Sequence, residues 1–252
     1  MKFLKCFFDA KSPSQIVMKI GSPAHKLVIC FMLFAIVMII FFKNRITAKI
    51  DRKIKVIATW LTICAHASDL LWFYLNDGIF WSQLFNLELC NATMMMSFIL
   101  NLNKKSKRNN TLFYFIYIWS FGAFGAIVAP ANIQGFGPDK MRFWAFFVVH
   151  GYILLTAVYG IVVDNYVLVW AGCSKSLKVL VMLAAFVGIV DVTCHQNYMF
   201  LQETVFPMSL LGEGVAYYIN LFLVCLAITV LLWIPHGIRA ANLRKDVAKL
   251  SM

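Results

Sequence analysis

Charged residues are scarce in this sequence. They make up 13% of its 252 residues, about half of their share in soluble proteins, while hydrophobic residues make up 62% against roughly 45–50%. This balance, with a mean hydropathy of +0.78, excludes a water-soluble globule, a disordered chain and a fibrous repeat protein. The composition is typical of a chain whose helices run through lipid for about 17–25 residues at a time.

Several motifs that carry chemistry in other proteins are missing too. The seven cysteines contain no CxxC pair, so neither a zinc ribbon nor a disulfide framework is indicated. No glycine-rich phosphate loop or dinucleotide fingerprint occurs, and we expect no cofactor, nucleotides included. The first 20 residues lack the apolar core of a removable signal peptide. No internal repeat of the kind found in many transporters is present.

Nearly uncharged runs along the chain predict an all-α polytopic membrane protein. Seven runs approach or exceed the length of a transmembrane helix, and they cover 27–42, 56–75, 79–102, 111–131, 143–163, 179–196 and 215–234. The predicted organisation is a basic N-terminal segment at 1–26, a seven-helix transmembrane domain at 27–235 and a basic cytoplasmic tail at 236–252. The first run has only 16 residues, and an alternative with six spanning helices and a re-entrant first run stays open.

The net charge of +12 follows the predicted membrane topology. Alternate loops hold six, four and two Lys and Arg residues and the tail holds four, against two in the opposite loops. This bias predicts a multi-pass protein of the cell membrane with a cytoplasmic C-terminus, although the N-terminal segment with its five lysines is then outside. The charges form no stripe with interleaved aromatic residues, so nucleic acid is not an expected partner. A dense basic patch predicts contact with an anionic membrane surface, through Lys104, Lys105, Lys107 and Arg108.

Polar and ionisable residues inside the predicted spans fall in one leaflet, on the outer side. Such groups cost at least about 2.5–3.5 kcal/mol each in hydrocarbon, so they indicate a polar cavity. His66 with Asp69, and Asp191 with His195, are three and four residues apart, and each pair shares a face of a helix. We interpret these four residues and Glu88 as candidate supporting groups around a site.

Cys90 and His150 come out at similar depths on two different predicted helices. A cysteine nucleophile and a histidine base require such an arrangement, because the base must lie within about 2.6–3.2 Å of the thiol. The structural alternatives are a packing role for the cysteine and an interhelical hydrogen bond for the histidine. The spacing alone leaves these alternatives open.

Four groups of residues follow one another along the chain: 87–91 (LELCN); Gly122 with Gly125, Ala126 and Pro130; 150–152 (HGY) with Tyr159; and 197–201 (NYMFL) with Pro207 and 209–211 (SLL). In sequence and spacing they resemble the YwaF family of bacterial membrane proteins, which is related to eukaryotic transmembrane protein 164, over roughly residues 25–235. The resemblance implies a seven-helix phospholipid acyltransferase that uses a membrane cysteine assisted by a histidine. On this chain those two residues are Cys90 and His150.

We therefore predict a CoA-independent acyltransferase that moves an acyl chain from a phospholipid to a lysophospholipid. Cys90 is the predicted nucleophile, with His150 as general base and then general acid. The candidate substrate-binding residues, which lie near this pair or between the last two spans, are Asn91, Asn197, Tyr198 and Ser209. No metal is expected in this mechanism. The acyl chain, the head group and the oligomeric state stay open.

Two other functions are compatible with the sequence. In a zinc-dependent lipid hydrolase, His66, His150 and His195 would bind the metal with Asp69 or Asp191, although no HExxH spacing exists. In a binding or transport protein, the outer cavity would hold a small polar solute.

Overall fold

A computed structural model describes residues 7–9, 16–77, 87–103, 107–130, 133, 136–202, 212 and 214–250. Within these residues the chain is helical throughout, with no strand. The long helices are α2 (Pro23–Phe42), α3 (Ala48–Asp77), α5 (Leu89–Leu102), α6 (Lys107–Val128), α7 (Met141–Val162), α8 (Trp170–Cys194) and α9 (Val215–Leu250). Two single turns of 3-10 helix, η1 (Lys43–Arg45) and η3 (Tyr198–Phe200), lie between them.

The predicted all-α polytopic membrane protein is confirmed. Six of the described helices are long and apolar enough to cross a membrane. The short helix is α5 rather than the first one: α2 has 20 residues, whereas α5 has 14 and is only about 21 Å long, against about 30 Å of hydrocarbon. Of the predicted span 79–102, the helical part begins at Leu89, and the part before Leu87 lies outside the described residues.

Local sequence signals account for several helix ends. Ser22 is the N-cap of α2, where its hydroxyl accepts a hydrogen bond from the His25 amide, and Pro23 follows at the first helical position. Helix α8 ends where His195 adopts the left-handed conformation, with φ 52° and ψ 45°. Helix α9 runs through Pro235 to Leu250, so the region predicted as a separate tail continues the last helix.

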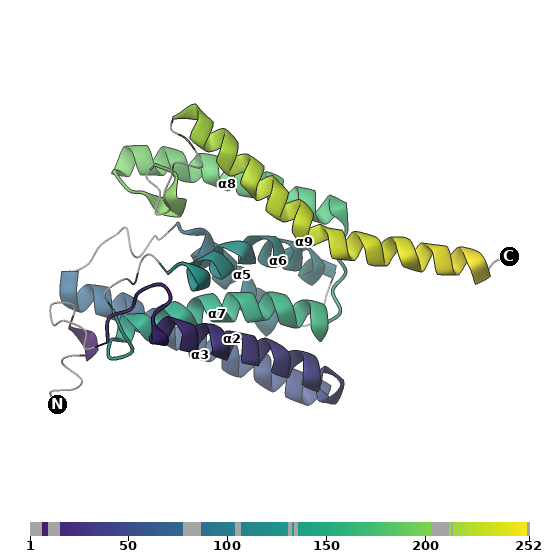
Figure 1. Cartoon of the computed structure of the whole chain (residues 1–252), viewed down its shortest axis with the longest axis horizontal. Helices are drawn as coiled ribbons and strands as arrows, with labels where there is room; N and C mark the ends of the chain where they lie inside the picture. Colours follow the sequence, from purple (N-terminus) through teal and green to yellow (C-terminus); the bar gives the residue numbers. More distant parts are fainter. Residues whose placement is uncertain are drawn as a thin grey trace.

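The helices form two unequal groups. Helix α7 packs against α2, α3, α5 and α6, while α8 pairs with α9 and contacts the larger group through α6. Figure 1 shows the α8–α9 pair on one side of the molecule and α2 with α3 on the other, and the C-terminal part of α9 extends beyond the remaining helices. The two groups therefore meet mainly along α6.

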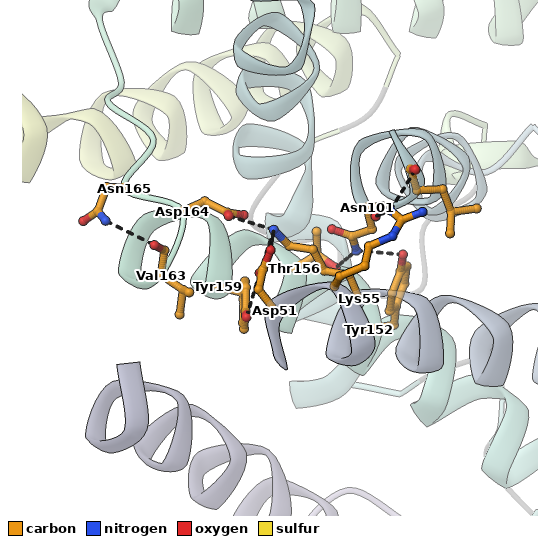
Figure 2. Close-up of polar contacts among 11 residues, drawn as sticks. Asp51, Lys55, Asn101, Tyr152, Thr156, Tyr159, Val163, Asp164 and Asn165 are labelled. Atoms are coloured by element: carbon orange, nitrogen blue, oxygen red, sulfur yellow. Dashed lines mark hydrogen bonds and ion pairs between the residues drawn. The ribbon is translucent and has the colours of Figure 1, made fainter. Parts of the chain in front are cut away.

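A partly buried ion cluster joins α3 to the segment that follows α7 (Figure 2). The Lys55 ammonium lies 2.9 Å from Asp51 and 2.7 Å from Asp164. The Tyr159 hydroxyl donates a hydrogen bond to the carboxylate oxygen Oδ1 of Asp51 at 2.9 Å. These contacts fix the start of α3 against the end of α7.

A second set of polar contacts ties α5 to the same two helices (Figure 2). The Asn101 amide donates to the Tyr152 hydroxyl at 2.9 Å and to the Thr156 hydroxyl at 3.3 Å. The Tyr152 hydroxyl also lies 2.9 Å from the hydroxyl of Thr59 on α3. The Arg52 guanidinium donates to the carbonyl groups of Asn101 and Leu102 at the end of α5. This end of the bundle is thus held by satisfied polar groups.

A buried histidine joins the start of α2 to the end of α6. His25 is 3% exposed, its Nδ1 accepts a hydrogen bond from the Gly21 amide at 2.9 Å, and its Nε2 lies 2.9 Å from the Ile127 carbonyl. Because a carbonyl group only accepts hydrogen bonds, Nε2 carries the proton. Both ring nitrogens are satisfied, so this histidine is structural.

Candidate functional site

A cavity of about 1180 Å³ lies between the larger group of helices and the α8–α9 pair. Its wall is formed by side chains of α3, α5, α6, α7, α8 and α9 and by the residues around η3. A volume of this size is typical of a site for a whole small molecule or a large part of a lipid.

Most of the sequence-predicted site residues line this one cavity. From the larger helix group and the loop after α8 come His66, Asp69, Glu88, Cys90, Asn91, His150, Asn197 and Tyr198. Asp191 is fully buried beside the cavity wall, whereas His195 is exposed and does not line the cavity. Ser209 lies outside the described residues, as do Lys104, Lys105 and the side chains of Lys107 and Arg108.

Cys90 is the second residue of α5, which begins in the cavity wall. Its side chain packs against a buried cluster that includes Met94 and Val149. A Cβ atom added at Gly122 would lie 3.8 Å from the Cys90 sulfur, so α6 also passes close to this thiol. The start of a helix carries partial positive charge, which favours an anionic sulfur.

His150 lies on α7, next to Val149 and two turns into the helix. Its Nδ1 atom is 2.7 Å from the Phe146 carbonyl oxygen, and because a carbonyl only accepts, Nδ1 carries the proton. In the neutral ring Nε2 is then the hydrogen-bond acceptor. The backbone contact therefore selects the tautomer that a general base requires.

Two carboxylates hold the loop that follows α8. Glu88 Oε2 accepts a hydrogen bond from the Met199 amide at 3.0 Å, and Asp191 Oδ1 accepts one from the Tyr198 amide at 2.9 Å. Asn197 Oδ1 accepts from the Gln202 amide at 2.9 Å. Both carboxylates therefore hold the backbone that closes one side of the cavity, and their supporting role at a site stays a prediction.

The predicted pairing of Asp191 with His195 is wrong. Helix α8 ends at Cys194, and the left-handed conformation of His195 turns its side chain away from the helical spacing. The zinc alternative thereby loses one of its three histidines. Within the described part of the chain, no group of three His, Cys, Asp or Glu side chains lies close enough to hold a metal ion.

Two of the cavity residues that the sequence reasoning did not single out carry a charge or a thiol. Arg142 and Cys225 line the cavity, on α7 and α9. A sequence signal existed for Arg142, because it is one of only two basic residues in the loops predicted to face outward. The α8–α9 wall is otherwise largely apolar and includes Val181, Ala185, Ile189, Leu221 and Phe222.

The fold and the cavity define a polytopic helical membrane protein with an amphipathic internal site that exposes a thiol and an imidazole. The model of the TMEM164 family matches residues 20–234. The chain belongs to the TMEM164 family, which confirms the predicted relation to transmembrane protein 164, and the closer assignment to the YwaF family stays a prediction. No curated protein matches the sequence. No solved structure matches it either.

Proposed function

We propose that this protein is a CoA-independent phospholipid acyltransferase of the cell membrane. One observation carries the proposal: Cys90 and His150, on different helices, line the same cavity, and its lining combines polar groups with many apolar side chains. An ester of a fatty acid with a polar head group has the same division into polar and apolar parts. Membership of the TMEM164 family supports the membrane location that the proposal requires.

The first half of the proposed reaction is acyl transfer to the protein. His150 Nε2 takes the proton from the Cys90 thiol, and the thiolate attacks the ester carbonyl carbon of a phospholipid. The tetrahedral intermediate collapses with cleavage of the bond between the acyl carbon and the glycerol oxygen. The imidazolium of His150 returns its proton to that oxygen, which releases a lysophospholipid and leaves a thioester on Cys90.

The second half reverses these steps with a different alcohol. The hydroxyl of a lysophospholipid gives its proton to His150 Nε2 and attacks the thioester carbonyl carbon. The carbon–sulfur bond breaks, the proton passes from His150 to the sulfur, and the new phospholipid leaves. No bond energy from CoA or a nucleotide is needed, because an ester is exchanged for an ester.

Asn91, Asn197 and Tyr198 are the proposed substrate contacts among the described residues. Their side chains line the cavity, and amide and hydroxyl groups suit the oxygen atoms of glycerol and its esters. We propose that the substrate enters with its acyl chains against the α8–α9 wall, where apolar contact area is available.

The decisive experiment follows acyl exchange between an isotopically labelled phospholipid and a lysophospholipid in proteoliposomes. We expect Cys90→Ser and His150→Ala each to lower the rate by at least about 100-fold, and the double variant to be scarcely slower, because both residues serve the same step. Cys225→Ser is the matched control, since it changes a second thiol of the same cavity. Mass spectrometry of the wild type should find the acyl adduct on Cys90.

Near-normal exchange by a folded Cys90→Ser protein would refute the nucleophile. Loss of exchange in Cys225→Ser but not in Cys90→Ser would move the role to the other thiol. All variants need the elution profile and melting temperature of the wild type, because a buried serine hydroxyl without a partner costs about 1–3 kcal/mol.

A further inference from the structure

Arg142 occupies an unusual position for a cation in this fold. It is the second residue of α7 and lines the cavity together with Phe146 and His150, which follow at intervals of four residues. Eight residues of helix correspond to about 12 Å. The cavity therefore extends along α7 from a guanidinium at one end to the proposed base deeper in the bundle.

Aromatic rings hold this guanidinium. Its central carbon lies 4.3 Å from the ring centroid of Phe73, 5.1 Å from that of Trp72 and 5.8 Å from that of Phe136. Arg142 also interacts electrostatically with the carboxyl group of Asp69, another residue that lines the cavity. The three rings thus surround the cation and stabilise its charge by cation–π attraction.

The charge pattern of the loops supports a specific use for this residue. Only Lys140 and Arg142 break the shortage of basic residues in the loops predicted to face outward. Lys140 is 1% exposed and donates a hydrogen bond to the Asp9 carbonyl at 2.9 Å. Arg142 instead lines the cavity. Placing a cation in hydrocarbon costs free energy, so a cation inside a membrane domain indicates a functional polar site.

We propose that Arg142 binds the phosphodiester of the phospholipid head group and so positions the ester for Cys90. The inference rests on the proposed function and adds the feature that separates phospholipids from neutral glycerolipids. A planar guanidinium forms two parallel hydrogen bonds with a phosphate, a geometry that lysine does not reproduce. The head group at Arg142 leaves the ester and acyl chains to extend along α7 toward His150. On α3, His66 lies one turn before Leu70 and two turns before Phe73, and all three residues line the cavity.

The test uses binding, so that it does not depend on catalysis. A short-chain diether phospholipid, which has no ester to react, is added to purified protein and to Cys90→Ser, and its affinity is measured from the melting temperature. The diether glycerol with the same chains and no phosphate is the comparison ligand. We expect the phospholipid to bind both proteins equally well, and to bind Arg142→Gln about 10- to 100-fold more weakly.

Arg142→Lys and Lys19→Gln complete the set of variants. The lysine keeps the charge and the cation–π contacts but lacks the planar fork of donors, so it should fold normally and still bind several-fold more weakly. Lys19 is an exposed cation outside the cavity, and its loss should change nothing. Equal phospholipid affinity in wild type, Arg142→Gln and Arg142→Lys would overturn the proposal, as would equal affinity of the wild type for the diether glycerol.

Two further outcomes separate this inference from its neighbours. If inorganic phosphate alone reproduced the stabilisation at similar concentrations, the site would be one for free phosphate, and the head-group proposal would be wrong. If the diether phospholipid bound through Arg142 but no acyl exchange occurred in the wild type, the phosphate site would stand and the proposed acyltransferase would fail. In an active protein, Arg142→Gln should also reduce the preference for phospholipid over diacylglycerol as acyl donor by about 10-fold or more.

Discussion

Replacing Lys55 by methionine tests whether the ion cluster in Figure 2 holds the bundle together. The lysine is the single cation that the cluster provides for two carboxylates, Asp51 and Asp164, at 2.9 and 2.7 Å. The Asp164 side chain is 4% exposed and that of Asp51 21%. Removing the cation leaves two like charges facing each other, one of them almost fully buried.

The expected cost of Lys55→Met is about 3–5 kcal/mol of unfolding free energy, because the variant removes the cation from both ion pairs of a largely buried cluster. Asp164→Asn is expected to cost less, roughly 1.5–3 kcal/mol, since Lys55 keeps its pairing with Asp51 and only one charge-assisted hydrogen bond is weakened. The double variant should be more stable than Lys55→Met alone. The costs of two independent losses would add, so a double variant more stable than Lys55→Met would show that the two residues are coupled.

The assay is unfolding by SDS in mixed micelles, followed by circular dichroism. Lys53→Met, on the same helix but exposed, is the control and should stay within about 0.5 kcal/mol of the wild type. Equal costs for Lys55→Met and Asp164→Asn, or a double variant less stable than both, would show that the cluster is not held by the balance of its charges.

Three further predictions concern the cavity and its surroundings. A Cβ atom at Gly125, in the cavity wall, meets no described atom within 4 Å. Gly125→Leu should therefore fold and shift the acyl-chain preference in the exchange assay toward shorter chains, by about 10-fold or more per rejected methylene. An unchanged chain-length profile would contradict this prediction. Glu88→Leu leaves the Met199 amide without its carboxylate acceptor, so amide hydrogen exchange at residues 198–201 should accelerate. Glu88→Gln keeps an acceptor oxygen and should leave the exchange rate unchanged. Equal exchange rates in the two variants would show that the Glu88 side chain does not hold this loop. In a background lacking Cys6, Cys30, Cys64 and Cys194, Gln202→Cys should react with an impermeant thiol reagent on intact cells and Val167→Cys only after permeabilisation; the reverse pattern would invert the topology.

The spans were predictable from the sequence, but their ends were less so. Helix α8 was expected at 179–196 and is observed at Trp170–Cys194. The prediction began after the last charge of the preceding loop, whereas Lys175 and Lys178 lie on the helix and are exposed. Lysine side chains extend along a helix and keep their ammonium group in a polar environment, so an uncharged run marks the apolar core of a span rather than its full length.

The ion cluster was out of reach of sequence reasoning for a different reason. Asp51 and Lys55 are four residues apart, so their pairing on one helix was visible. Lys55 and Asp164, in contrast, are separated by 109 positions. In the topology argument Lys55 counted only as a loop charge, and the two aspartates did not count at all. Which loop charges meet inside a bundle depends on helix packing, which hydropathy does not encode.

The break before Cys90 is the point at which sequence and structure differ in a way that bears on function. The run 79–102 is long enough to span and was predicted to place Cys90 in mid-helix, where every backbone amide is bonded to the preceding turn. In the structure Glu88 has an extended conformation, with φ −63° and ψ 140°, and the helix begins after it. The Glu88 carboxylate stabilises this break, because it accepts a hydrogen bond from the Met199 amide across the cavity rim. The amides of Leu89 and Cys90, at the first two positions of α5, precede the intrahelical bonding. If the proposed acyl transfer occurs at Cys90, the amides at this helix start are candidates to stabilise the developing oxyanion.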